Sequence, residues 1–90
     1  MSVERKSILV TGATRGVGEA LTLEFANKGH VVYALARTRS QLNSLVDRCG
    51  EGKVIPFQVD VSNIEQVKEA TSGIHRDYGT PDVLINNAGI

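Results

Sequence analysis

Four apolar runs of strand length alternate along the chain with longer segments of helical spacing. The runs are "SILVT" (7–11), "VVYALA" (31–36), "VIPFQV" (54–59) and "DVLIN" (82–86), and charged residues hardly interrupt them. Nearly unbroken apolar runs are typical of strands that are covered on both faces, as in a parallel sheet. The pattern therefore predicts four buried, parallel strands.

The segments between these runs predict three helices. Apolar faces are formed by Val17, Leu21 and Phe25 in the first, by Leu42, Leu45, Val46 and Cys49 in the second, and by Ile64, Val67, Thr71, Ile74 and Tyr78 in the third. Gly29, Gly50 and Gly79 follow the three segments, at positions where a residue with positive φ commonly closes a helix. Ser62 and Glu65 have the S-x-x-E spacing of a capping box, which predicts the start of the third helix.

This alternation predicts an α/β fold with a Rossmann-type, doubly wound parallel sheet. Right-handed crossovers give the strand order 3-2-1-4, which is the N-terminal βαβαβαβ part of such a fold. Pro56 lacks a backbone donor and fits the third strand, which is an edge in that order. In a complete fold further strands would pair with the fourth. We therefore expect residues 1–90 to be one partial domain whose C-terminal half is absent.

Charge and cysteine content exclude several classes of protein. Ten basic residues balance ten acidic ones without clustering, so we expect neither a nucleic-acid partner nor binding to a membrane surface. The single cysteine, Cys49, cannot form an internal disulfide, and no apolar stretch has the length of a signal or membrane segment. These features predict a soluble, cytoplasmic protein.

Three glycines crowd the turn between the first strand and the first helix. Gly12, Gly16 and Gly18 give the spacing G-x-x-x-G-x-G, which differs from the commoner dinucleotide fingerprint G-x-G-x-x-G. Glycines permit a tight turn and let backbone N–H groups approach a pyrophosphate, while the helix N-terminus adds free donors and a partial positive charge. The turn is thus predicted to hold phosphate; the alternative is a glycine-rich turn without a ligand.

Three motifs resemble the classical short-chain dehydrogenase/reductase family. They are "TGATRGVG" (11–18), "DV" (60–61) and "NNAG" (86–89), and with them the resemblance covers essentially the whole chain. It implies a Rossmann-type NAD(P)-binding domain. It also implies an oxidoreductase that transfers a hydride between a nicotinamide cofactor and a carbonyl or alcohol substrate.

The resemblance also implies which residues contact the cofactor. The diphosphate contacts would be Gly12, Thr14, Arg15, Gly16, Val17 and Gly18. The adenine would lie near Asp60 and Val61, and the nicotinamide ribose near Asn87, Ala88 and Gly89.

The end of the second strand indicates which nicotinamide cofactor is used. An NAD-binding domain usually places a carboxylate there for the ribose 2′-hydroxyl, but this chain has Ala36. Arg37 and Arg15 could instead hold a 2′-phosphate through charge-assisted hydrogen bonds, so the sequence predicts NADP(H). The resemblance agrees, because NADP-preferring members often have basic residues at these two places. The alternative is ordinary surface charge, and Arg39 could either contribute or be solvated.

Catalytic and metal-binding residues cannot be assigned in this sequence. The family's reaction depends on a Ser, an Asn and a Y-x-x-x-K pair, and neither Tyr33 nor Tyr78 begins such a motif. We expect those residues beyond Ile90, in a longer protein. No Cys/His/Asp cluster has ligand spacing, so no metal is predicted, and Cys49 is interpreted as a core thiol.

Three functions remain open at this stage. The first is the cofactor-binding part of an NADP(H)-dependent oxidoreductase, which as a complete enzyme would act on a small carbonyl or alcohol and form a homo-oligomer. The second is a truncated, non-catalytic product that binds only nucleotide or a partner's strand. The third is a nucleotide-sugar epimerase of the extended branch of the superfamily, which "NNAG" disfavours.

Overall fold

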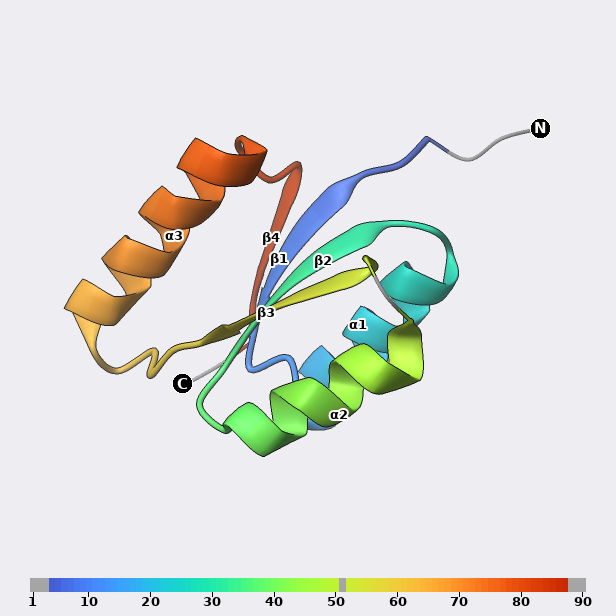
Figure 1. Cartoon of the computed structure of the whole chain (residues 1–90), viewed down its shortest axis with the longest axis horizontal. Coiled ribbons are helices and arrows are strands. Elements are labelled where there is room, and N and C mark those ends of the chain that lie inside the picture. Colours follow the sequence, from blue (N-terminus) through green and yellow to red (C-terminus); the bar gives the residue numbers. More distant parts are fainter. Residues whose placement is uncertain (1–3, 51, 88–90) are drawn as a thin grey trace.

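Strands and helices alternate throughout the computed structural model, which describes residues 4–50 and 52–87. The elements are β1 (Ser7–Thr11), α1 (Gly16–Asn27), β2 (Val31–Ala36), α2 (Arg39–Cys49), β3 (Val54–Gln58), α3 (Ile64–Tyr78) and β4 (Val83–Asn86). The strands are parallel and lie in the order β3-β2-β1-β4 (Figure 1). The predicted Rossmann-type α/β fold and its strand order are therefore confirmed, and Pro56 lies on an edge strand, as expected.

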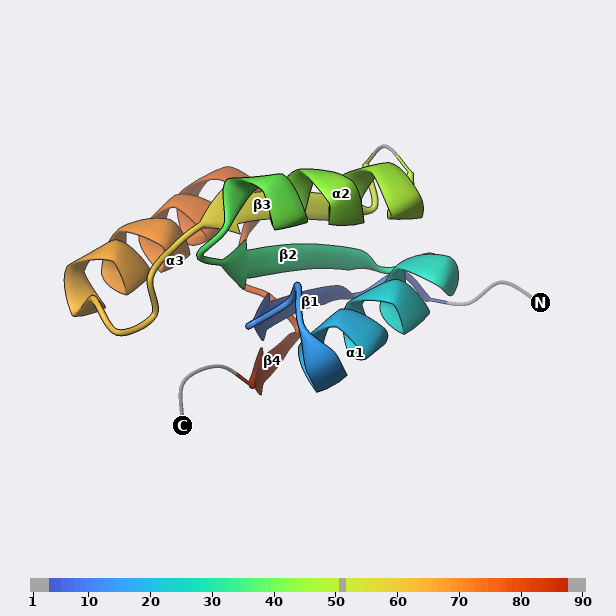
Figure 2. The same cartoon turned by 90° about the horizontal axis from the view of Figure 1, so that it is seen from below.

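The two faces of the sheet are covered unequally. Helices α1 and α2 lie against one face and α3 lies against the other (Figures 1 and 2). The core under α1 and α2 comprises Ile8, Val10, Ala13, Ala26, Val32, Ala34, Ala36, Leu42, Leu45 and Val54. The core under α3 is smaller and comprises Leu9, Tyr33, Leu35, Val59 and Ile74. On the α3 side β4 stays open, because Leu84, the neighbour of Leu9 in the sheet, is 67% exposed.

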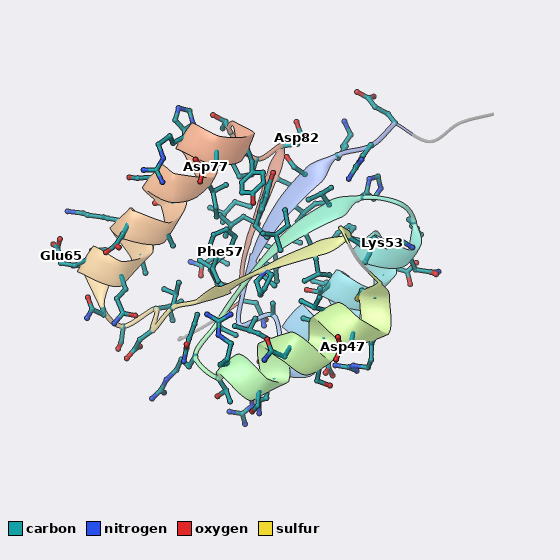
Figure 3. All side chains as sticks on the ribbon, viewed as in Figure 1. Asp47, Lys53, Phe57, Glu65, Asp77 and Asp82 are labelled. Carbon is teal, nitrogen blue, oxygen red and sulfur yellow. The ribbon has the colours of Figure 1, made fainter. Side chains whose placement is uncertain are left out.

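The start of β4 is joined to the start of β1 by Asp82, which had been expected to lie within the strand. Its carboxylate accepts hydrogen bonds from the Ser7 backbone N–H (2.8 Å) and hydroxyl (3.2 Å), and its own N–H donates to the Ser7 carbonyl (2.9 Å). The two bonds that the carboxylate accepts from Ser7 lower the pKa of Asp82 below its ordinary value. Asp82 thus aligns the neighbouring strands β1 and β4 before their ladder begins (Figure 3).

Helix α1 presents only part of the predicted face to the sheet: Phe25 packs against the core, but the fully buried positions are different ones. Gly18, Thr22 and Ala26 are its buried residues, whereas Val17 is 65% exposed. The residues at these three positions are small, so the helix axis can approach the sheet more closely than a face of Leu and Phe would allow. Close approach at the glycine turn therefore overrides the apolar periodicity.

Helix α3 departs from its prediction at both ends. The predicted face is buried at Ile74, but Ile64 is 62% exposed and Tyr78 is also exposed. The predicted capping box is wrong as well, because the N-cap is Asn63. Its side-chain oxygen accepts from the backbone N–H groups of Glu65 and Gln66, two and three residues further along the chain. The hydroxyl of Ser62 instead donates to the carboxylate of Asp60, two residues earlier in the loop.

Candidate functional site

The glycine turn after β1 depends on backbone conformations that glycine adopts most readily. Gly12 has a φ of 63° and Gly16 a φ of 52°, both in the left-handed region. Between them, the buried Ala13 donates its N–H to the carbonyl of Leu35 at 3.3 Å. The turn is therefore bonded to the end of the neighbouring strand β2.

Gly18 is required for a different reason, which is space. A Cβ at this position would overlap the carbonyl oxygen of Gly12 and lie 2.8 Å from Nδ2 of Asn87. The first turn of α1 is consequently packed against the end of β1. Arg15, the N-cap of α1, contributes no side-chain cap, and a helix leaves its first N–H groups without partners inside the helix.

Thr11 joins the carboxyl ends of β1 and β4. Its hydroxyl lies 3.0 Å from Oδ1 of Asn86 and accepts from the backbone N–H of Asn87 at 2.9 Å. Thr11 is buried, so these bonds are shielded from water. They fix the backbone that leads into the "NNAG" motif.

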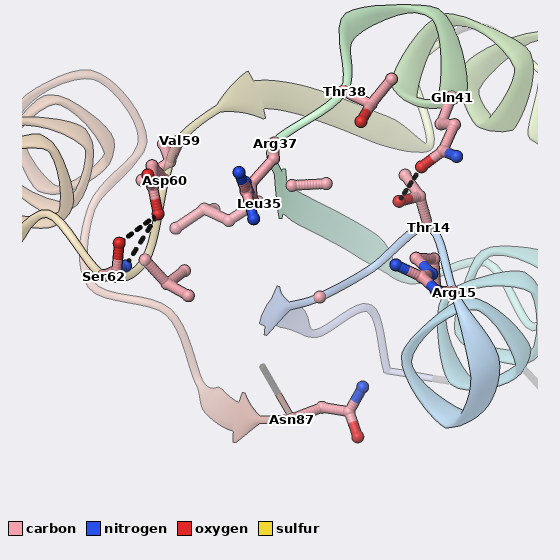
Figure 4. A pocket seen from close by; sticks show the side chains of 13 residues that line it. Thr14, Arg15, Leu35, Arg37, Thr38, Gln41, Val59, Asp60, Ser62 and Asn87 are labelled. Carbon is pink, nitrogen blue, oxygen red and sulfur yellow. Dashed lines mark hydrogen bonds between the residues drawn. The ribbon is translucent and has the colours of Figure 1, made fainter. Parts of the chain in front are cut away.

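A cleft of about 560 Å³ opens where the carboxyl ends of the strands meet the glycine turn (Figure 4). It is lined by Gly12, Thr14, Arg15, Leu35, Ala36, Arg37, Thr38, Gln41, Val59, Asp60, Val61, Ser62 and Asn87. In open α/β sheets, ligands bind in the crevice outside the carboxyl ends of the strands. The cleft is therefore the candidate binding site.

Two guanidinium groups border this cleft. Arg15 and Arg37 are exposed, and within the described part of the chain neither guanidinium makes a hydrogen bond or ion pair. The backbone of Arg37 is held in place, since its carbonyl accepts from Nε2 of Gln58 at 3.1 Å. Ala36, at the end of β2, is buried and adds no charge. This part of the cleft thus offers positive charge from two fixed elements.

The opposite side of the cleft is formed by the loop after β3. Asp60 accepts from the Ser62 hydroxyl at 2.7 Å and from the Ser62 N–H at 3.0 Å, and its own N–H donates to Oε1 of Gln66 at 2.9 Å. The bonds from Ser62 lower the pKa of the Asp60 carboxyl, and the positive charge of Arg37 contributes in the same direction. Asp60 is thus held ionised, with both bonds from Ser62 on one of its oxygens.

The structure brings most of the predicted contact residues into this one cleft. Those that line it are Gly12, Thr14, Arg15, Arg37, Asp60, Val61 and Asn87. Gly16, Val17 and Gly18 form the first turn of α1 next to it. The predicted contacts at Ala88 and Gly89 lie outside the described residues.

Several lining residues were missed by sequence reasoning. They are Leu35, Ala36, Thr38, Gln41, Val59 and Ser62. Gln41 is the most informative, because its Oε1 accepts from the Thr14 hydroxyl at 3.1 Å (Figure 4). Their signal was available in the predicted topology, since the residues that follow β2 and β3 must meet at the carboxyl edge of the sheet.

Comparison with known proteins decides the family. The short chain dehydrogenase family matches residues 6–90, which is nearly the whole chain. The chain belongs to this family. A 3-oxoacyl-[acyl-carrier-protein] reductase from Thermotoga maritima is 42% identical over the full chain, which covers 37% of that protein. An NADP-dependent 3-hydroxy acid dehydrogenase from Shigella flexneri is 39% identical over 92% of the chain, covering 33% of that protein.

Solved structures of this family have the same fold. L-Sorbose reductase from Gluconobacter frateurii, complexed with NADPH and L-sorbose, superposes with a TM-score of 0.86 at 29% identity over 100% of the chain and 35% of its own. Serine dehydrogenase from Escherichia coli gives a TM-score of 0.85 at 37% identity over 93% of the chain and 38% of its own. The chain thus spans about a third of the length of these short-chain dehydrogenases.

The groups around the cleft could hold a nicotinamide dinucleotide. Gly18 has no Cβ and lets the start of α1 lie close to the turn, and two guanidiniums face the same space. The described residues contain no group of three or more His, Cys, Asp or Glu side chains that could hold a metal ion. Among the helices described, none has the length and apolar character needed to span a lipid bilayer.

Proposed function

We propose that this chain is the NADP(H)-binding part of a short-chain oxidoreductase that acts on a carbonyl or alcohol group of a small molecule. When bound, the nicotinamide would supply or accept the hydride. The chain's own residues would hold the cofactor: the glycine turn at the diphosphate, Asp60 and Val61 at the adenine, and Asn87 toward the nicotinamide ribose.

The observation that carries the proposal is the charge at the end of β2. Arg15 and Arg37 line the cleft together, and the residue at which NAD-binding domains usually place a carboxylate is the buried Ala36. A 2′-phosphate is a dianion near neutral pH, and arginine binds phosphate through two parallel N–H donors. The cleft therefore favours the phosphorylated cofactor over NAD(H).

Relatives support the same cofactor. The Shigella flexneri dehydrogenase is named as NADP-dependent, and the Gluconobacter frateurii reductase was solved with NADPH. An alcohol dehydrogenase from Thermococcus sibiricus, at 30% identity and a TM-score of 0.81, was solved with 5-hydroxy-NADP. The proposal extends to residues 1–90 as part of an NAD(P)-binding domain and to a cytoplasmic homo-oligomer for the whole enzyme.

A non-catalytic role is the second candidate. Tyr33 is buried under α3 against the rings of Phe57 and Tyr78, and neither tyrosine is among the residues that line the cleft. Among the described residues, the cleft thus has groups that bind a cofactor but no tyrosine to act as acid or base. Both candidates predict that residues 1–90 alone reduce no carbonyl, so the encoding transcript decides between them: a transcript that does not continue past Ile90 into a Ser and a Y-x-x-x-K motif would support this candidate.

The proposal is tested by titrating the chain with NADPH and NADH and following cofactor fluorescence, with circular dichroism to verify folding. We expect NADPH to bind at least about tenfold more tightly, a difference of about 1.4 kcal/mol. Equal affinities, or tighter binding of NADH, would contradict the assignment of NADP(H).

A matched pair of variants locates the preference. Arg37→Gln should weaken NADPH binding about tenfold and leave NADH unchanged, because only NADPH has the 2′-phosphate. Arg39→Gln removes the same charge two residues further along, from a side chain that does not line the cleft. It should leave both affinities unchanged, and equal losses in the two variants would show a general charge effect.

A further inference from the structure

An ion pair connects the two helices beside the cofactor cleft. Nη2 of Arg48, in the last turn of α2, lies 2.8 Å from Oε2 of Glu19, in the first turn of α1. Both side chains are partly shielded, with exposed fractions of 46% and 34%. Both residues line a groove of about 290 Å³, together with Thr14, Ser40, Gln41 and Ser44. Thr14 and Gln41 line the cofactor cleft as well, so the two spaces adjoin.

Glu19 also lies one helical turn after Arg15. Arg15 is the N-cap of α1, with extended backbone dihedrals, and its carbonyl accepts from the Glu19 backbone N–H at 3.2 Å. The first turn of α1 thus links Glu19 to Arg15 through the backbone, while the Glu19 side chain binds Arg48. The Arg15 guanidinium makes no ion pair among the described residues.

We propose that Arg48 is a positioning residue for cofactor selection: by binding Glu19, it keeps Arg15 free to bind the 2′-phosphate. This inference rests on the proposed function. Without Arg48, the Glu19 carboxylate would turn to Arg15 and compete with the phosphate for the same guanidinium. Arg48 itself contacts no cofactor in this account, because it lies in the adjoining groove and not in the cleft.

The two partners of the ion pair provide the decisive test, because removing either one breaks the same bond. Arg48→Met should weaken NADPH binding about fivefold and change NADH binding less than twofold. Glu19→Gln should leave NADPH binding as tight as in the parent chain or tighter, since no carboxylate remains to occupy Arg15. The double variant should regain the parent affinity, and Arg48→Lys should keep most of it.

A purely structural role gives a different result. If the bond only held α1 to α2, Glu19→Gln would weaken NADPH binding as much as Arg48→Met does, and the double variant would not recover. That outcome, an equal loss of NADH affinity, or no effect of Arg48→Met would overturn the inference. Lys28→Met is the matched control, because it removes another ion pair of α1, that of Lys28 with Glu24 at 3.1 Å, at the far end of the helix.

The same titrations separate this inference from the proposed function. A parent chain that binds NADPH no more tightly than NADH would overturn the proposed function, and this inference with it. A parent chain with the expected preference, together with an Arg48→Met variant that keeps it, would overturn the role of Arg48 alone.

Discussion

The glycine turn and the Arg15/Arg37 pair border the same cleft but differ in how strongly the surrounding structure restrains them. The turn is fixed by sterics: Gly18 has no space for a Cβ, and Gly12 has a left-handed φ of 63°. The two arginines are exposed, and their guanidiniums have no bonds within the described part of the chain. The conformation of the turn is therefore fixed by close packing and by the backbone, whereas the arginines are exposed surface charge.

This difference separates two roles within the site, namely folding with general dinucleotide binding and discrimination between cofactors. Changes in the turn should affect folding and every dinucleotide alike, because the turn determines how close α1 comes to β1. Changes at the arginines should affect only the discrimination between phosphorylated and unphosphorylated cofactors. The following predictions test that separation.

The largest effect is expected from Gly18→Ala. The added Cβ would overlap the Gly12 carbonyl oxygen, and a backbone atom cannot rotate away as a side chain can. We expect a loss of about 3 kcal/mol in the free energy of unfolding by urea, and loss of binding of both NADPH and NADH.

Gly73→Ala is its control, since Gly73 also lies within a helix. There the nearest heavy atom to an added Cβ is a guanidinium nitrogen of Arg76 at 3.7 Å, an ordinary contact. This substitution should stabilise the chain by about 0.5–1 kcal/mol through higher helix propensity. Equal destabilisation of both variants would contradict the steric account of Gly18.

Reversal of charge at Arg37 should come next in size. Arg37→Asp places a carboxylate beside the end of β2, where it would repel a 2′-phosphate and accept hydrogen bonds from a ribose hydroxyl. We expect the ratio of NADPH to NADH affinity to fall about 100-fold, or about 2.8 kcal/mol. The unfolding midpoint should hardly change because the side chain is exposed, so a large drop in stability would contradict the comparison.

A smaller effect is expected at Gly16. Its φ of 52° disfavours any residue with a Cβ, although no heavy atom lies within 4 Å of the space that a Cβ would occupy. Gly16→Ala should therefore cost about 1 kcal/mol, or about 4–8 °C in the midpoint of thermal unfolding, from backbone strain alone. A cost as large as that of Gly18→Ala would show a clash that the structure does not contain.

The smallest effect concerns ionisation at the far side of the cleft. Ser62→Ala removes the hydroxyl that most strongly lowers the pKa of Asp60, so this pKa should rise toward its ordinary value of about 3.9. A lowered pKa stabilises the fold above the unfolded pKa, and this stabilisation is lost as the pH falls through the folded pKa. The variant should thus lose part of the acid-dependent change in stability.

Carboxyl NMR during a pH titration measures this pKa directly. Ser72→Ala, in the exposed part of α3, provides the control and should leave the pKa of Asp60 unchanged. An Asp60 pKa that does not move in Ser62→Ala would contradict the hydrogen bonds observed in the loop.

The sequence predicted the positions of the strands because each apolar run contains a strand in the structure, and right-handed crossovers between parallel strands then gave their order. It also predicted most residues of the cleft, since the glycine spacing and the family motifs mark the carboxyl edge of the sheet. It failed where packing distance decides. The buried face of α1 consists of Gly18, Thr22 and Ala26, which no hydrophobicity pattern identifies.

Contacts between distant segments were equally invisible in the sequence. The hydrogen bond from Thr14 to Gln41 and the ion pair of Arg48 with Glu19 join residues 27 and 29 positions apart. Nothing in local spacing pairs these residues, because the pairing depends on the angle at which α2 crosses beside α1. The cap of α3 was missed for a local reason: Ser62 bonds to Asp60, which leaves Asn63 to cap the helix.

The central claim is that one cleft holds the cofactor and that its arginines recognise the 2′-phosphate. The most direct measurement is amide NMR of the labelled chain during titration with NADPH and, separately, NADH. We predict that both cofactors shift the amides of Gly12 and Asp60, whereas only NADPH shifts that of Arg37 strongly. Shifts confined to α3 or β4, or the same response of Arg37 to both cofactors, would contradict the account.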